Sequence, residues 1–138
     1  AGISDGLGLG ANAKAALITR GVVEMARLGV ALGARERTFW GLSGLGDLVP
    51  TCLGGRNRWL GEQLGRGRSL RHALHGKDMV IEGIETTRAA AGLGRRERIE
   101  LPIIEQVDAV LFHHRPPRQA LLALMRRSHK AESPRLSG

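Results

Sequence analysis

The longest run of helical periodicity extends from residue 11 to residue 33, where apolar residues recur every three or four positions. Two apolar stripes follow this spacing: Ile18, Val22, Met25, Gly29 and Leu32 in the first, and Ala16, Val23, Ala26 and Val30 in the second. The polar edge that remains is narrow and consists of Arg20, Glu24 and Arg27. A helix that is apolar around most of its circumference is expected at the centre of the fold. Gly21 and Gly29 would each cost about 1 kcal/mol relative to Ala in an exposed helix, so they predict close approach of a neighbouring helix.

Shorter helical patterns follow, and glycine, serine and proline mark their ends. The predicted helices span residues 36–43, 56–64, 70–75, 85–93, a segment that begins at 101–103, and 118–127. A first helix is expected to end near Ser4. Ser69 is a typical N-cap, and Pro102 stands near the first position of its helix, where proline is favoured. Phe39 and Trp40 are expected to face inward.

The segments between these helices are predicted to be irregular. Pro50 is expected to break any helix that Leu48 and Val49 begin, because the proline nitrogen carries no hydrogen. The other non-helical predictions are an extended connector at residues 79–81, a turn at Glu82-Gly83, a charged linker at residues 92–98 and a disordered basic tail at residues 128–138.

Composition supports an all-α fold. The chain has 138 residues, of which 42% are hydrophobic, and this length suits a single domain, predicted at residues 1–127. Only 3% of the residues are aromatic, so the core must be built from Leu, Ile, Val and Ala, which favours helices over a β-sandwich.

The formal net charge of +8 lies mainly downstream. Residues 1–50 carry five Lys or Arg against four Asp or Glu, which leaves sixteen against nine in residues 51–138. A basic tail can bind nucleic acid, but it is as often a solvated chain end, so nucleic-acid binding is the weaker interpretation. The lone cysteine, Cys52, has no partner for a disulfide, which indicates a reducing cytoplasm. The sequence predicts no membrane-spanning segment and no export signal.

Candidate chemistry is concentrated between residues 44 and 58. Asp47 stands in an uncharged run, Thr51 follows four residues later, and two glycines lead into Arg56-Asn57-Arg58, where a helix is predicted to begin. A helix start presents free backbone N–H groups and a positive dipole end, and an Arg guanidinium can bind phosphate with two hydrogen bonds. The segment therefore suggests a small phosphorylated substrate. The alternative is a helix-capping loop in which the arginines are simply solvated.

Two other patterns are discounted. Gly6, Gly8 and Ala11 fit the glycine spacing of a dinucleotide-binding loop, but no strand can precede them within five residues. The histidine pairs, His72 with His75 and His113 with His114, have no acid or cysteine at ligand spacing, so no metal site is predicted.

Several motifs together resemble one family. These are Ala-Gly-Ile-Ser-Asp-Gly-Leu-Gly at 1–8, Asn-Ala-Lys-Ala-Ala-Leu-Ile-Thr-Arg-Gly at 12–21, Gly-Leu-Gly-Asp-Leu at 44–48, Thr51-Cys52, Gly55-Arg56-Asn57-Arg58, Glu82-Gly83 and Leu101-Pro102-Ile103. In this order they resemble the C-terminal domain of NAD(P)-dependent glycerol-3-phosphate dehydrogenase. The resemblance implies an all-helical fold like that of the C-terminal domain of 6-phosphogluconate dehydrogenase. It also implies an enzyme that interconverts dihydroxyacetone phosphate and sn-glycerol 3-phosphate.

The resemblance assigns roles residue by residue. Asp47 matches the family's active-site aspartate and Thr51 the threonine beside it, while Gly55, Arg56 and Asn57 match substrate-phosphate residues. The cofactor, NAD or NADP, is expected to contact Arg56, Val80 and Glu82. The Gly54-Gly55 loop is tighter than in many bacterial members, which leaves the contact at Gly55 open.

The resemblance also predicts what lies outside this chain. It places the family's catalytic lysine and its cofactor-binding Rossmann domain upstream of the position of Ala1. The expected partners are therefore the substrate and an N-terminal Rossmann domain, with a homodimer left open, and the 138 residues alone are expected to be inactive. A stand-alone basic helical module that binds nucleic acid or another polyanion is the alternative.

Overall fold

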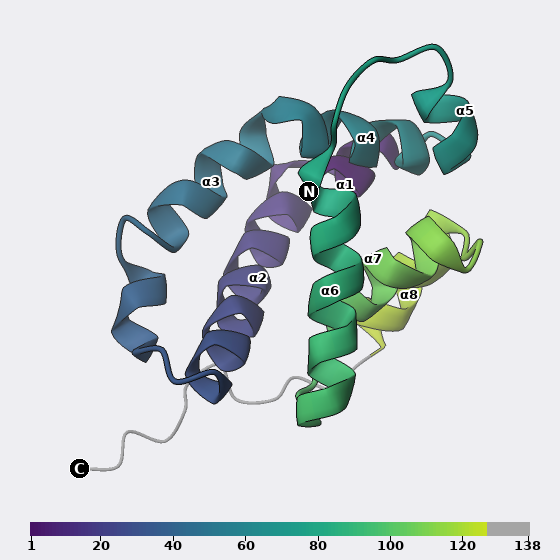
Figure 1. The fold of residues 1–138 in the computed structure, drawn as a ribbon. Coiled ribbons are helices and arrows are strands. Elements are labelled where there is room, and N and C mark those ends of the chain that lie inside the picture. Colours follow the sequence, from purple (N-terminus) through teal and green to yellow (C-terminus); the bar gives the residue numbers. More distant parts are fainter. Residues whose placement is uncertain (127–138) are drawn as a thin grey trace.

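The computed structural model describes residues 1–126, and within them the chain is helical with no strand. The predicted all-α fold class is confirmed. The elements, shown in Figure 1, are α1 (Gly2–Gly6), α2 (Ala11–Ala31), the 3₁₀ helix η1 (Glu36–Trp40), α3 (Leu45–Leu53), α4 (Gly55–Gly65), α5 (Leu70–Leu74), α6 (Glu82–Glu97), α7 (Pro102–Phe112) and α8 (Pro117–Met125). No helix among the described residues is long and apolar enough to cross a membrane. The tail predicted at residues 128–138 lies outside the described residues, so the domain division remains a prediction.

The long helix α2 contacts several other elements, but it is less enclosed than its apolar pattern predicted, because Met25, Val30 and Leu32 of the two stripes are exposed. It contacts α1, η1, α3 and α7, and Figure 1 shows it running through the middle of the molecule. Its buried residues include Val22 and Ala26 from the two apolar stripes. The close approach predicted at Gly29 is confirmed, because a Cβ atom there would lie 2.0 Å from Cζ of Phe39. Gly21 has only ordinary contact, with Leu48.

Glu24 lies inside the protein, whereas the sequence pattern placed it on the polar edge of α2. Its side chain is only 4% exposed and accepts hydrogen bonds from the backbone N–H groups of Ile103 (2.7 Å) and Ile104 (3.3 Å). These N–H groups belong to the first turn of α7 and have no partner within their own helix. Glu24 therefore caps α7 from another helix, an interaction that helical periodicity does not reveal.

Helices α1 and α4 pack backbone against backbone. Each contributes two glycines four residues apart, Gly2 and Gly6 on α1 and Gly61 and Gly65 on α4. A Cβ atom at Gly6 would lie 2.3 Å from the carbonyl oxygen of Glu62, and one at Gly65 would lie 2.4 Å from that of Ile3. No side chain could fit between the two helices, so glycine is required on both sides of the contact.

The main core lies where α4 and α5 meet α7 and α8. Its buried members are Leu60, Leu64, Ala73, Ile81, Val110, Leu111 and Ala120. Ile3 of α1 and Trp59 of α4 pack against this cluster from its edge. The composition-based prediction of an aliphatic core is thus confirmed for this cluster.

Four local predictions were wrong. Pro50 lies within α3 and does not end it. Because proline has no N–H, the backbone carbonyl of Gly46 loses its hydrogen bond within the helix. Gly46 is exposed, so water can replace the missing donor. The helix α6 begins at Glu82 and ends at Glu97, so the predicted turn and all of the predicted linker except Arg98 are helical. Trp40 is 45% exposed, whereas Phe39 is partly buried against α2.

Other local predictions are confirmed. Ser69 caps α5, since its hydroxyl oxygen accepts a hydrogen bond from the backbone N–H of His72 at 3.2 Å. Pro102 is the first residue of α7, as expected for proline near a helix start. Residues 79–81 form the irregular connector that leads into α6.

Candidate functional site

The first turn of α4 meets the first turn of α6 through two neighbouring side chains. Nη2 of Arg56 lies 2.6 Å from Oε1 of Glu82, and both side chains are more than half exposed. The side-chain oxygen of Asn57 accepts a hydrogen bond from the backbone N–H of Gly83 at 3.0 Å. The structure therefore brings together three residues that were selected from the sequence although 26 positions separate Arg56 from Glu82.

The backbone at the start of α4 is open to an anion. Gly54 is extended, and Gly55 has a φ of +87°, a conformation that residues with a Cβ rarely adopt. No side chain caps the helix, and a Cβ at either glycine would meet nothing within 4 Å. The free N–H groups of this turn, the positive end of the helix dipole and the exposed guanidinium of Arg56 together make a surface that suits a phosphate.

Asp47 and Thr51 lie on α3, which precedes α4 with only Gly54 between the two helices. Both residues are exposed, and the Thr51 hydroxyl donates a hydrogen bond to the backbone carbonyl of Asp47 at 2.8 Å. This bond does not involve the carboxylate. Within the part of the chain that the structure describes, no hydrogen bond or ion pair joins the Asp47 carboxylate to the side chains of Arg56 or Asn57.

Val80 and Glu82 belong to the segment that opens α6. Val80 is 71% exposed in the irregular connector, and Glu82 is the first residue of the helix. A carboxylate in the first turn is favoured by the helix dipole, which gives Glu82 a structural role besides its contact with Arg56.

The sequence interpretation missed an ion-pair network behind the first turn of α4. The two carboxylate oxygens of Asp5 lie 2.8 Å from Nζ of Lys14 and 2.8 Å from Nε of Arg58. Nη1 of Arg58 also lies 3.6 Å from Oε2 of Glu62. The hydrogen bond from Lys14 is the main reason why the pKa of Asp5 is lowered, and the charges of Lys14 and Arg58 lower it further. Asp5 and Lys14 both stand in the quoted motifs, but no spacing rule indicates that α1, α2 and α4 bring them together.

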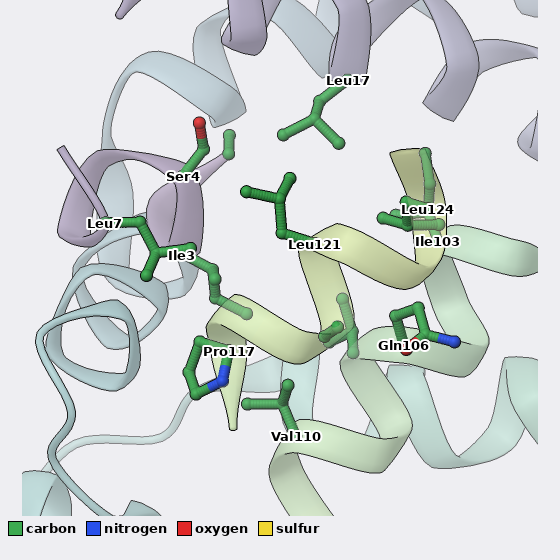
Figure 2. A pocket seen from close by; sticks show the side chains of 13 residues that line it. Ile3, Ser4, Leu7, Leu17, Ile103, Gln106, Val110, Pro117, Leu121 and Leu124 are labelled. Carbon is green, nitrogen blue, oxygen red and sulfur yellow. The ribbon is translucent and has the colours of Figure 1, made fainter. Parts of the chain in front are cut away.

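A second feature, an apolar pocket, does not suit a phosphorylated substrate. It lies between α1, α2, α7 and α8, and Figure 2 shows its lining. The residues around it are Ala1, Ile3, Ser4, Leu7, Leu17, Ile103, Gln106, Val107, Val110, Pro117, Ala120, Leu121 and Leu124. None of them carries a charged side chain, so the pocket offers no counter-charge for a phosphate dianion.

Comparison with known proteins shows the family to which the chain belongs. The model of the family described as NAD-dependent glycerol-3-phosphate dehydrogenase C-terminus matches residues 1–122. The glycerol-3-phosphate dehydrogenase (NAD(P)+) of Syntrophotalea carbinolica is 60% identical over 134 residues, which are 96% of this chain and 40% of that protein. The protein of the same name from Geobacter sp. strain M21 is 54% identical over the same shares of the two chains.

A solved structure shows the same fold. The crystal structure of glycerol-3-phosphate dehydrogenase from Coxiella burnetii superposes with a TM-score of 0.84 at 42% identity, covering 91% of this chain and 39% of the other. The chain thus spans about two fifths of the length of these relatives. Because the family model matches most of the sequence, this chain belongs to the NAD-dependent glycerol-3-phosphate dehydrogenase family and corresponds to its C-terminal domain.

Proposed function

We propose that this chain is the substrate-binding part of a glycerol-3-phosphate dehydrogenase, which interconverts dihydroxyacetone phosphate and sn-glycerol 3-phosphate. Family membership supports the proposal, and the observation that carries it is the start of α4. There, an uncapped helix turn and the exposed guanidinium of Arg56 lie against the first turn of α6. The comparisons give no support to the alternative of a nucleic-acid-binding module.

The substrate phosphate binds at the first turn of α4 in this proposal. Arg56 supplies two parallel N–H donors, Asn57 supplies an amide, and Gly55 lets the phosphate approach the backbone closely. Arg56 is paired with Glu82 at an exposed position, where an ion pair contributes only about 0–1 kcal/mol. A phosphate dianion can therefore replace the Glu82 carboxylate as the partner of Arg56.

Asp47 and Thr51 act at the reacting end of the substrate. The resemblance places the family's catalytic lysine upstream of Ala1, and a nearby carboxylate raises the proton affinity of a lysine. Asp47 is exposed and its carboxylate is not used by Thr51, so it is free to face such a lysine. The lysine would exchange a proton with the oxygen on C2 of the substrate.

A nicotinamide cofactor, NAD or NADP, supplies the hydride that is exchanged with C2 of the substrate. Val80 and Glu82 fit the edge of such a group, because one offers exposed apolar surface and the other a carboxylate acceptor. Arg56 lies beside Glu82 and can contact both cofactor and substrate. We assign the larger part of the cofactor site to an N-terminal Rossmann domain, as the resemblance to the dehydrogenase family implies.

The proposal also covers the cellular location and the oligomeric state. A single free cysteine and small phosphorylated substrates are consistent with a cytoplasmic location. A homodimer fits the proposal as well as a monomer does, and nucleic acid has no part in it.

The experiment joins this chain to the part of the Syntrophotalea carbinolica relative that precedes the matched region; we call this protein the chimera. The chimera should reduce dihydroxyacetone phosphate with NADH or NADPH. Arg56→Ala should raise the Michaelis constant for dihydroxyacetone phosphate about 10- to 100-fold, the value of a hydrogen bond to a charged group. Arg56→Lys should recover only part of this loss, because an ammonium keeps the charge but not the planar fork.

Two further variants separate the roles. Asp47→Asn should lower the turnover number and shift its pH dependence, with a smaller effect on the Michaelis constant. Arg71→Ala, which removes an exposed arginine of α5, is the matched control and should change neither constant. If Arg56→Ala left the Michaelis constant unchanged, the cluster would be a solvated helix start and the assignment of this site would be wrong.

A further inference from the structure

We infer that Asp5, paired with Lys14 through one carboxylate oxygen and with Arg58 through the other, is a positioning residue that fixes the first turn of α4 for phosphate binding. The inference rests on the proposed function, because it takes Arg56 and Asn57 as phosphate-binding groups. Asp5 itself does not contact the substrate in this proposal. Its effect passes through Arg58, which follows Asn57 directly on α4.

The network is more enclosed than the pair at the helix surface. The side chains of Asp5, Lys14 and Arg58 are 14%, 18% and 29% exposed, whereas those of Arg56 and Glu82 are 54% and 58% exposed. Partial burial reduces screening by water and strengthens a charge-assisted hydrogen bond. Arg58 is therefore bound firmly within the protein, while Arg56 can change partners.

Asp5 is a suitable anchor because α1 cannot shift relative to the body of α4. Asp5 precedes Gly6, whose position on α1 is set by backbone contact: a Cβ atom at Gly6 would lie 2.3 Å from the carbonyl oxygen of Glu62 and 2.7 Å from Cα of Gly65. These contacts involve the second half of α4, and Gly2 makes a similar contact in the first half, where a Cβ atom would lie 2.1 Å from the carbonyl oxygen of Arg58. The carboxylate of Asp5 then reaches Arg58 in the first half of the same helix and transmits this fixed position to it.

The first turn of α4 needs such a restraint. It has no side-chain N-cap, and Gly54 and Gly55 before it place few limits on the backbone. Besides the link from Asp5 to Arg58, its restraints are the hydrogen bond from Gly83 to Asn57, the exposed pair of Arg56 with Glu82, and the backbone contact of Gly2 with Arg58. The second of these is given up when a phosphate binds. The link through Arg58 then remains to keep the turn in place.

Lys14 completes the arrangement from α2. Its ammonium group lies 2.8 Å from Oδ1 of Asp5, so Oδ2 remains directed at Arg58. The hydrogen bond from Lys14 also lowers the pKa of Asp5, which keeps the carboxylate ionised. Removal of Lys14 should consequently weaken the same function as removal of the Asp5 charge, but to a smaller extent.

The test compares two substrates of the chimera, dihydroxyacetone phosphate and dihydroxyacetone, which lacks the phosphate. Asp5→Asn should lower kcat/KM for dihydroxyacetone phosphate by at least about tenfold and leave that for dihydroxyacetone within about twofold. Lys14→Met should cause a smaller loss with the same selectivity. Glu97→Gln, which removes an exposed ion pair with Arg96 at the end of α6, is the matched control and should affect neither substrate.

The outcomes distinguish the two proposals. A folded chimera that binds NADH but does not reduce dihydroxyacetone phosphate would overturn the proposed function, and this inference with it. An active chimera in which Asp5→Asn lowers kcat/KM equally for both substrates, or for neither, would overturn only the inference. If Asp5→Asn does not fold, as judged by circular dichroism, Lys14→Met decides by the same comparison, and an unselective effect there counts against the inference.

Discussion

Replacing Gly65 with alanine should destabilise the domain, although the same exchange in an unobstructed helix is stabilising. Gly65 is the last residue of α4 and faces α1. A Cβ atom at this position would lie 2.4 Å from the carbonyl oxygen of Ile3 and 2.8 Å from Cα of Gly6. Both obstructing atoms are backbone atoms, so no side-chain rotation can make room. The two helices would have to separate.

The magnitude follows from three contributions. Alanine gains about 1 kcal/mol of helix propensity over glycine. Overpacking typically costs about 1–3 kcal/mol, and the separation of α1 from α4 also exposes part of Ile3, whose complete burial would contribute about 1.5–3 kcal/mol. Ile3 is only partly buried, so a fraction of that last value applies. The expected net change is a loss of about 1–3 kcal/mol in the free energy of unfolding.

The assay is urea denaturation of the 138-residue chain followed by far-UV circular dichroism, with Gly92→Ala as the matched control. Gly92 lies inside α6, and a Cβ atom there would meet nothing within 4 Å. This control should therefore be stabilised by up to about 1 kcal/mol. If Gly65→Ala raised the free energy of unfolding as much as Gly92→Ala does, the backbone contact between α1 and α4 would not exist in solution.

Two further predictions concern helix starts. Glu24→Ala should lower the free energy of unfolding by about 1–3 kcal/mol, since two partly buried N–H groups of α7 lose their acceptor, and Glu24→Gln should lose less because its amide oxygen still accepts one bond. Burial raises the pKa of Glu24 above its ordinary 4.5, so the folded state binds a proton at this carboxylate more readily than the unfolded state does. The wild type should therefore gain stability relative to Glu24→Gln as the pH falls from above that raised pKa towards 4.5. A difference between the two proteins that does not change with pH in urea titrations would count against this account. Ser69→Ala should cost about 1 kcal/mol through loss of the cap on α5, whereas Ser69→Gly should cost only a few tenths; equal losses in the two variants would contradict the capping role.

The features of the fold that could be predicted from sequence are those set by neighbouring residues. Ser69 caps its own helix and Pro102 begins one, because both effects act within a single turn. The errors arose where distant contacts decide. Glu24 looked like part of a polar edge until α7 supplied the N–H groups that it binds. Pro50 looked like a helix breaker, but its missing hydrogen bond lies at the surface of α3.

The candidate site, too, could be predicted from sequence only where neighbouring residues define it. The cluster at the start of α4 could be selected from sequence, because an arginine after two glycines at a helix start is a local pattern. Its connection to Glu82, 26 positions away, was suggested only by family resemblance and is visible as an ion pair in the structure. Asp5 lies 53 positions from Arg58, and nothing local shows that α1 and α4 touch. The catalytic and binding roles of these residues remain predictions.

The arrangement of successive residues on α4 fits the proposal that substrate binds there without a change of fold. Arg58 is held by Asp5 in an enclosed network, and Asn57 is held by the backbone of α6, so both keep the turn in place. Arg56, in contrast, has an exposed partner whose loss costs only about 0–1 kcal/mol. A phosphate dianion offers Arg56 more negative charge than one carboxylate does, together with the free N–H groups of the turn. In the proposed function this exchange favours substrate, while the residues that fix the turn are not disturbed.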